Sequence, residues 1–204
     1  MAEFTAKDVQ ALRQATGAGM MDAKKALTET GGDMDKAQDY LREQGIAQAE
    51  KRADRTQAEG VVGVYMHNQS GRPVIGVLVG LASETDFVAK SDEFISVAND
   101  IAMHAAAARP LWVNREDVPD EVVAKERDLI AAQARNEGKP DEIVDKIVEG
   151  RIGSFYKDTV LVDQVFVRSD RFEGTVGELV QQLAAKMGEN ISISSMARVE
   201  VGEN

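Results

Sequence analysis

Apolar residues near the start of the chain recur with the three-to-four-residue spacing of amphipathic helices. Three helices are expected, from Thr5 to Gly17, from about Met20 to Thr28, and from Asp33 to Gly45. Their candidate core positions are Val9, Leu12, Ala15, Ala23, Ala26, Leu27, Ala37, Tyr40 and Leu41. Glycine turns separate the helices, so this region predicts a compact bundle with a very small core.

At Gly60 the period changes from helical to strand-like. Residues 61–66 and 74–79 are runs rich in β-branched side chains, and residues 67–73 between them contain Asn, Ser, Gly and Pro. These residue types favour turns, so the pattern predicts a β-hairpin.

The rest of the chain alternates helical and strand-like segments at no constant period. Helices are expected at about 91–108, 119–136, 141–156 and 175–187, and strands at 160–167 and 191–201. This order favours an α+β fold, with an antiparallel sheet packed with helices and a helical hairpin, over a doubly wound sheet.

Residues 46–59 are rich in alanine and charge and have no apolar stripe, which indicates a solvated helical linker. We therefore expect two domains. Residues 1–54 would form the N-terminal three-helix bundle and linker helix, and residues 55–204 a core domain.

Composition narrows the function classes. The 204 residues include 24 Lys and Arg, 35 Asp and Glu, and no Cys, with a net charge of −11. An acidic chain is a poor match for phosphate backbones, so direct nucleic-acid binding is not expected. The lack of Cys excludes a disulfide framework and a thiol nucleophile. We find neither a signal peptide nor a membrane-length apolar run, and expect a cytoplasmic protein with no membrane contact.

Catalytic signatures are nearly absent. The segment Gly17-Ala18-Gly19 follows a helix rather than a strand, so it is not a dinucleotide fingerprint. The two histidines, His67 and His104, have no second ligand at metal spacing. We expect no catalytic residue, no metal site and no cofactor.

Two segments stand out from this background. Met20 and Met21 adjoin a two-glycine turn; they either fill the tiny core or present a soft apolar surface to a partner. Residues 84–90, Glu-Thr-Asp-Phe-Val-Ala-Lys, lie between a strand and a helix. Phe87 and Val88 there either plug a helix end or form an aromatic wedge beside the carboxylate of Asp86.

These segments resemble the bacterial translation elongation factor Ts family, in its short form. The resemblance rests on residues 16–27, Thr-Gly-Ala-Gly-Met-Met-Asp-Ala-Lys-Lys-Ala-Leu, on residues 84–90, and on the ending Arg198-Val199-Glu200-Val201-Gly202. They follow the family's order across nearly the whole chain. Ala23 replaces a frequent Cys, and the chain from Val160 onward resembles one core half where long members have two.

The resemblance implies a ubiquitin-associated-like N-terminal bundle and a core that binds elongation factor Tu, both GDP-bound and nucleotide-free, and promotes GDP release. It implies that Asp86 and Phe87 enter the partner near its magnesium and phosphate site. The partner-binding residues that it implies are Leu12, Arg13, Met20, Met21, Thr85, Asp86, Phe87 and Val88. The nucleotide and Mg²⁺ would belong to the partner.

Two other function classes fit parts of the sequence. The N-terminal bundle alone is compatible with a ubiquitin-type or chaperone adaptor, which leaves residues 84–90 unexplained. An acidic small-molecule enzyme would use Asp86 and His104.

A homodimer is also expected. A chain with one core half recovers a composite surface by pairing with a second copy. The apolar strand predicted at 160–167 is the candidate for the buried edge.

Overall fold

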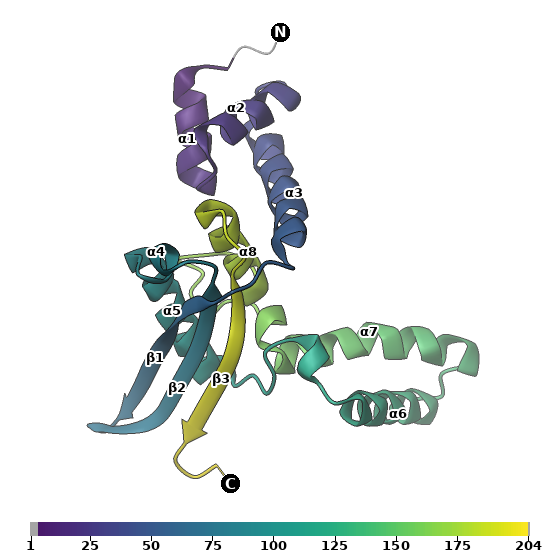
Figure 1. The fold of residues 1–204 in the computed structure, drawn as a ribbon. Coiled ribbons are helices and arrows are strands. Elements are labelled where there is room, and N and C mark those ends of the chain that lie inside the picture. The colour runs from purple at the N-terminus through teal and green to yellow at the C-terminus, as the bar shows by residue number, and fades with distance from the viewer. Residues whose placement is uncertain (1–3, 204) are drawn as a thin grey trace. The chain divides into compact units, whose positions relative to one another are not determined.

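The computed structural model describes residues 4–203, except the side chains at positions 46 and 48–50. It contains three N-terminal helices, a three-stranded antiparallel sheet packed with helices, and a helical pair (Figure 1), so the predicted α+β class is confirmed. The chain divides into two compact units. One comprises Met1–Val61, Leu81–Ile95 and Leu179–Ser192, and the other Val62–Gly80, Ser96–Glu178 and Ile193–Asn204.

The N-terminal bundle consists of α1 (Ala6–Thr16), α2 (Met20–Glu29) and α3 (Met34–Arg52). At the start of α1, the Thr5 backbone N–H donates to the Asp8 carboxylate at 2.6 Å, and the Asp8 N–H donates to the Thr5 hydroxyl at 3.4 Å. This reciprocal pair is a capping box, which satisfies N–H groups at the start of the helix. Gly17 ends α1 in the left-handed region, with φ of 71°.

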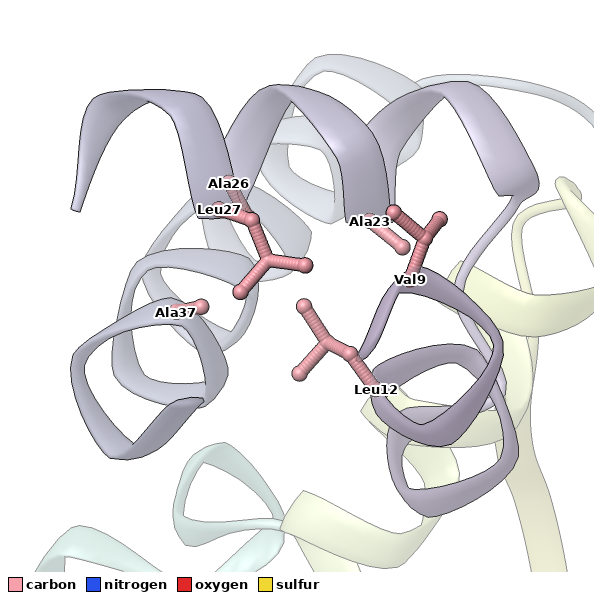
Figure 2. Close-up of a cluster of buried hydrophobic side chains, with 6 residues drawn as sticks. All are labelled: Val9, Leu12, Ala23, Ala26, Leu27 and Ala37. Carbon is pink, nitrogen blue, oxygen red and sulfur yellow. The ribbon is translucent and has the colours of Figure 1, made fainter. Parts of the chain in front are cut away.

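Small and branched apolar side chains form the core of this bundle. Its buried members are Val9, Leu12, Ala23, Ala26, Leu27 and Ala37. Leu12 and Leu27 point toward one another between their helices (Figure 2). All six were predicted core positions, and with three alanines among them the core is as small as the sequence suggested.

Helix α3 continues beyond its predicted end at Gly45 and reaches Arg52. One glycine inside a helix costs about 1 kcal/mol relative to alanine. The following residues, Ile-Ala-Gln-Ala-Glu-Lys, are mostly good helix formers, which offset that cost. The linker predicted at 46–59 is therefore helical in its first half and irregular from residue 53 to residue 58.

The sheet has the order β1-β2-β3, from β1 (Glu59–Gln69), β2 (Arg72–Ser83) and β3 (Ser192–Glu200). The hairpin between β1 and β2 is tighter than predicted, with Ser70 and Gly71 as its two turn residues. Their φ angles are 52° and 80°. Two successive positive φ angles match the twist of the flanking strands, so the ladder extends close to the turn.

Helix α5 (Asp92–Ala108) packs closely on β1 in the second unit. A Cβ atom at Gly63 would overlap the backbone of Ala98, so a residue without a side chain is required there. The Val64 N–H donates to Asn99 Oδ1 at 2.8 Å.

The predicted helical hairpin is present as α6 (Asp120–Asn136) and α7 (Asp141–Thr159), which lie side by side in Figure 1. Its buried apolar residues are Ile130, Ala134, Val144, Val148 and Ile152. The remaining helices are α4 (Asp86–Ala89), α8 (Val176–Met187) and the short 3₁₀ turns η1 (Arg115–Asp117) and η2 (Leu161–Asp163). Within residues 4–203, no helix has the length and apolar content to cross a membrane.

The prediction of a strand at residues 160–167 is wrong. In the structure this segment makes an isolated bridge from Val160 to Trp112, the turn η2, and an isolated bridge from Val165 to Thr175. Val160, Leu161 and Phe166 are buried at exposures of 0%, 0% and 3%. The apolar run thus contributes single side chains to the core instead of forming a ladder.

His104 is a buried polar residue on α5, fully enclosed at 0% exposure. Its Nε2 lies 3.0 Å from Gln164 Oε1, and its Nδ1 accepts the Val167 N–H at 3.2 Å. This arrangement is that of a neutral ring protonated at Nε2. Burial lowers the pKa of His104, because the charged form is poorly solvated there.

We expect this lowered pKa to make the protein less stable at mildly acidic pH. Below the unfolded pKa of about 6.5, the unfolded chain binds a proton at His104 that the folded chain resists. The stability that depends on a neutral His104 is therefore fully present above pH ~6.5, and it is lost as the pH falls toward the pKa of His104 in the folded protein. Urea unfolding of the wild type and His104→Gln at pH 7.5 and 5.5 measures it. The free energy of unfolding should fall more for the wild type than for His104→Gln when the pH is lowered. An equal fall in both proteins would contradict the lowered pKa of His104.

Candidate functional site

Phe87 is exposed on a short turn directly after β2. The Phe87 turn, defined as residues 84–90, contains α4, and the Phe87 side chain is 86% exposed. Ala89 of the same turn is buried, as is Phe94 on α5 with 0% exposure. Phe94 and not Phe87 therefore fills the core, and the structure places the Phe87 ring in solvent.

Asp86 and Lys90, on either side of Phe87 in the sequence, form a charged pair. The Lys90 Nζ atom donates to Asp86 Oδ2 at 2.5 Å, and the Asp86 side chain is 47% exposed. The Lys90 ammonium lowers the pKa of Asp86, and Asp86 raises that of Lys90. The turn thus presents an ionised carboxylate beside an aromatic ring.

Polar contacts to the backbone hold the Phe87 turn. The Ser83 hydroxyl donates to the Thr85 carbonyl at 3.2 Å, and the Ser91 hydroxyl donates to the Val88 carbonyl at 2.8 Å. From far along the chain, Glu189 accepts hydrogen bonds from the backbone of Glu84 and from Thr85. Hydrogen bonds therefore hold the backbone of both Thr85 and Val88 in this turn.

The predicted residues of the N-terminal bundle divide into core and surface. Met20 is 50% exposed, Met21 is 75% exposed, and Arg13 is exposed on α1. Leu12 is 0% exposed inside the bundle core. The apolar surface expected to include Leu12 therefore excludes its side chain, because the tiny core needs both of its leucines.

Met20 and Met21 are exposed because of where α2 begins. Gly19 is its N-cap in an extended conformation, and the residues that α2 buries are Ala23, Ala26 and Leu27. The two methionines occupy the first helical turn, ahead of the buried stripe.

His104, the histidine of the enzyme interpretation, is a buried structural residue. Both ring nitrogens of His104 are engaged inside the protein, and the ring is fully buried. His67 lies exposed near the hairpin turn, with Nδ1 3.4 Å from the Tyr65 hydroxyl. In the part of the chain that the structure describes, no group of three or more His, Asp or Glu could hold a metal ion.

Sequence reasoning missed Glu189 and Asn190. They follow α8 after Gly188, whose φ is 75°, and nothing in the local pattern marks them as more than residues that end a helix. Their contacts to residues 84 and 85 span more than 100 positions. A pairing at that separation leaves no periodic signal in a single sequence.

The comparisons with known proteins all match the same family. The family model described as Elongation factor TS matches residues 3–203. Elongation factor Ts of Carboxydothermus hydrogenoformans is 53% identical over 200 residues, covering 98% of this chain and 90% of that protein. The protein of the same name from Moorella thermoacetica is 50% identical over 200 residues, covering 98% and 96%. That of Desulforamulus reducens is 51% identical over 203 residues, covering 100% and 91%.

Proposed function

The chain belongs to the elongation factor Ts family, the nucleotide exchange factors of elongation factor Tu in translation elongation, and we propose that it acts on that partner mainly through the Phe87 turn. Members of this family are non-catalytic cytoplasmic factors. The lack of catalytic motifs in the sequence agrees with this role.

The observation that carries the proposal is the 86% exposure of Phe87 on a turn held by polar bonds. Burying a Phe side chain stabilises a structure by about 1.5–3 kcal/mol relative to leaving it in water. A wedge that makes this contact in the nucleotide-free complex strengthens that complex selectively. By thermodynamic linkage, a contact weaker in the GDP-bound complex must weaken GDP binding by the same factor.

Asp86 is proposed to make the polar half of the same contact. Its carboxylate is half-exposed and ionised beside Lys90, so it can accept hydrogen bonds from partner backbone or polar groups. Thr85 and Val88 shape the turn that presents both side chains.

The N-terminal bundle is proposed to supply a second contact, within a partner-binding module of residues 1–54. Exposed Met20 and Met21 offer a soft apolar surface that adapts to a partner groove. Arg13 adds a positive charge in the last turn of α1. Leu12 supports this surface from inside the core rather than by touching the partner.

Phe87→Ala tests the wedge directly. We expect stimulated GDP release from elongation factor Tu to fall about 30- to 1,000-fold, the range of an interface hot spot of about 2–4 kcal/mol. The free energy of unfolding should stay nearly unchanged, because the ring is exposed. Asp86→Ala should show a smaller loss, since water can partly replace its partners. Fluorescent GDP release and urea unfolding measure both.

Phe94→Ala is the matched control, with the same substitution at 0% exposure. It should cost about 3–5 kcal/mol of stability, with exchange per folded molecule retained. If Phe87→Ala instead lowered stability by that amount and left exchange per folded molecule unchanged, the wedge proposal would be wrong.

Replacing Met20 and Met21 by Ser tests the bundle surface. We expect weaker binding of nucleotide-free elongation factor Tu with little change in stability, because both side chains are at least half exposed. Leu12→Ala is the contrast and should lower stability by about 2–5 kcal/mol, as a buried Leu truncation does. Isothermal titration and thermal unfolding separate the effects. Wild-type affinity of the double Ser variant would remove the methionines from the interface.

We also propose that the chain forms a homodimer, because a chain with one core half recovers a composite surface by pairing with a second copy. Its predicted interface strand is absent from residues 160–167, but Val165 and Val167 remain 72% and 46% exposed there. We expect light scattering at micromolar concentration to give twice the mass of one chain. Val165→Glu should give the monomer, because it places a charge in an apolar contact. A monomeric wild type would contradict the dimer.

A further inference from the structure

We propose that Glu189 is a positioning residue for nucleotide exchange, because its carboxylate fixes the backbone from which Phe87 projects. This inference rests on the proposed role of Phe87 as the wedge. It adds a residue that lies more than 100 positions away in the sequence and that touches the turn without being part of it.

The Glu189 carboxylate satisfies three donors at once. Oε2 accepts the backbone N–H of Glu84 at 3.0 Å and that of Thr85 at 3.1 Å. Oε1 accepts the Thr85 hydroxyl at 2.5 Å. Hydrogen bonds to an ionised carboxylate are about twice as strong as those between neutral groups. Three of them on two adjacent residues fix both the position and the orientation of this backbone.

Thr85 is the N-cap of α4, a position whose hydroxyl ordinarily accepts a hydrogen bond from its own helix. In the described chain, the Thr85 side chain makes no such bond and donates to Glu189 instead. The hydroxyl therefore ties the turn to a distant segment rather than stabilising α4 locally.

The turn depends on outside contacts for its shape. Helix α4 has four residues, and such a short helix is not stable by itself in water. The Phe87 ring is 86% exposed, so its packing contributes little to ordering the backbone. The residues just before the ring, which Glu189 holds, therefore help to set the direction in which the ring points.

Glu189 is itself held by the residue that follows it. The Asn190 N–H donates to the Glu84 carboxylate at 2.6 Å, and its side-chain amide donates to the carbonyls of Ala53 and Arg55 at 3.1 and 3.0 Å. Arg55 in turn pairs with Glu84 at 3.4 Å. Because these bonds anchor the residue next to Glu189, its carboxylate acts from a fixed base.

A preorganised turn matters because ordering a loop on binding reduces affinity. Without the Glu189 contacts, the partner would have to select the productive orientation of Phe87 from many. The free energy spent on that ordering would no longer contribute to GDP release.

Glu189→Ala and Thr85→Val test the proposal from the two ends of the contact. Each should lower the maximal rate of GDP release from elongation factor Tu about tenfold, the effect of losing hydrogen bonds to a charged group. Thr85→Ser keeps the hydroxyl and should restore the wild-type rate. Glu173→Ala, on an exposed residue, makes the same change in net charge as Glu189→Ala and should leave the rate unchanged.

Two further measurements distinguish positioning from general stability. The amides of Glu84 and Thr85 should exchange hydrogen faster in Glu189→Ala, with protection elsewhere retained. In a double variant with Phe87→Ala, Glu189→Ala should cause no additional loss of exchange activity, because residues acting through one contact are not additive.

The outcomes separate the two proposals. If Phe87→Ala slows GDP release while Glu189→Ala and Thr85→Val do not, the positioning role is wrong and the wedge stands. A further loss in the double variant would likewise overturn the inference, since Glu189 would then act elsewhere. If Phe87→Ala has the wild-type rate, both proposals fail. Should Glu189→Ala not fold, the comparison of Thr85→Val with Thr85→Ser decides.

Discussion

Polar contacts to the backbone, and not packing of its aromatic ring, hold the Phe87 turn. A Phe side chain normally fixes a loop by being buried, whereas here the ring is left in water. The carboxylate of Glu189 and the hydroxyls of Ser83 and Ser91 take over that task. The ring is thereby available for a contact with another molecule without loss of order in the turn.

The N-terminal bundle also leaves apolar side chains exposed, because its core is very small. Its interior is made mostly of alanines and two leucines, which bring three helices close together but bury little apolar surface. Leu12 is buried in that interior, whereas Met20 and Met21 are exposed. The two exposed apolar surfaces of the proposed site, Phe87 and the Met20–Met21 pair, are therefore formed by side chains that the core does not bury.

An exchange factor of this kind works without any reacting group of its own. It needs a contact that is stronger in one state of its partner than in another, and about 1.4 kcal/mol of such difference changes nucleotide affinity tenfold. This explains why a sequence without catalytic or metal-binding motifs belongs to a family with a defined biochemical activity. His104, which resembles a catalytic candidate in the sequence, is a buried structural residue bonded to Gln164.

Local signals in the sequence determined the helices, the hairpin and the Thr5 cap, because helical periodicity and turn chemistry act over a few residues. The segments at residues 16–27, 84–90 and 198–202 likewise indicated the family by resemblance. Tertiary structure alone decided two matters: that Val160, Leu161 and Phe166 are buried as single side chains outside any strand, and that Glu189 meets Thr85. Each depends on which distant segment supplies the neighbour, and burial or a hydrogen-bond partner at that separation is set by packing and not by local pattern.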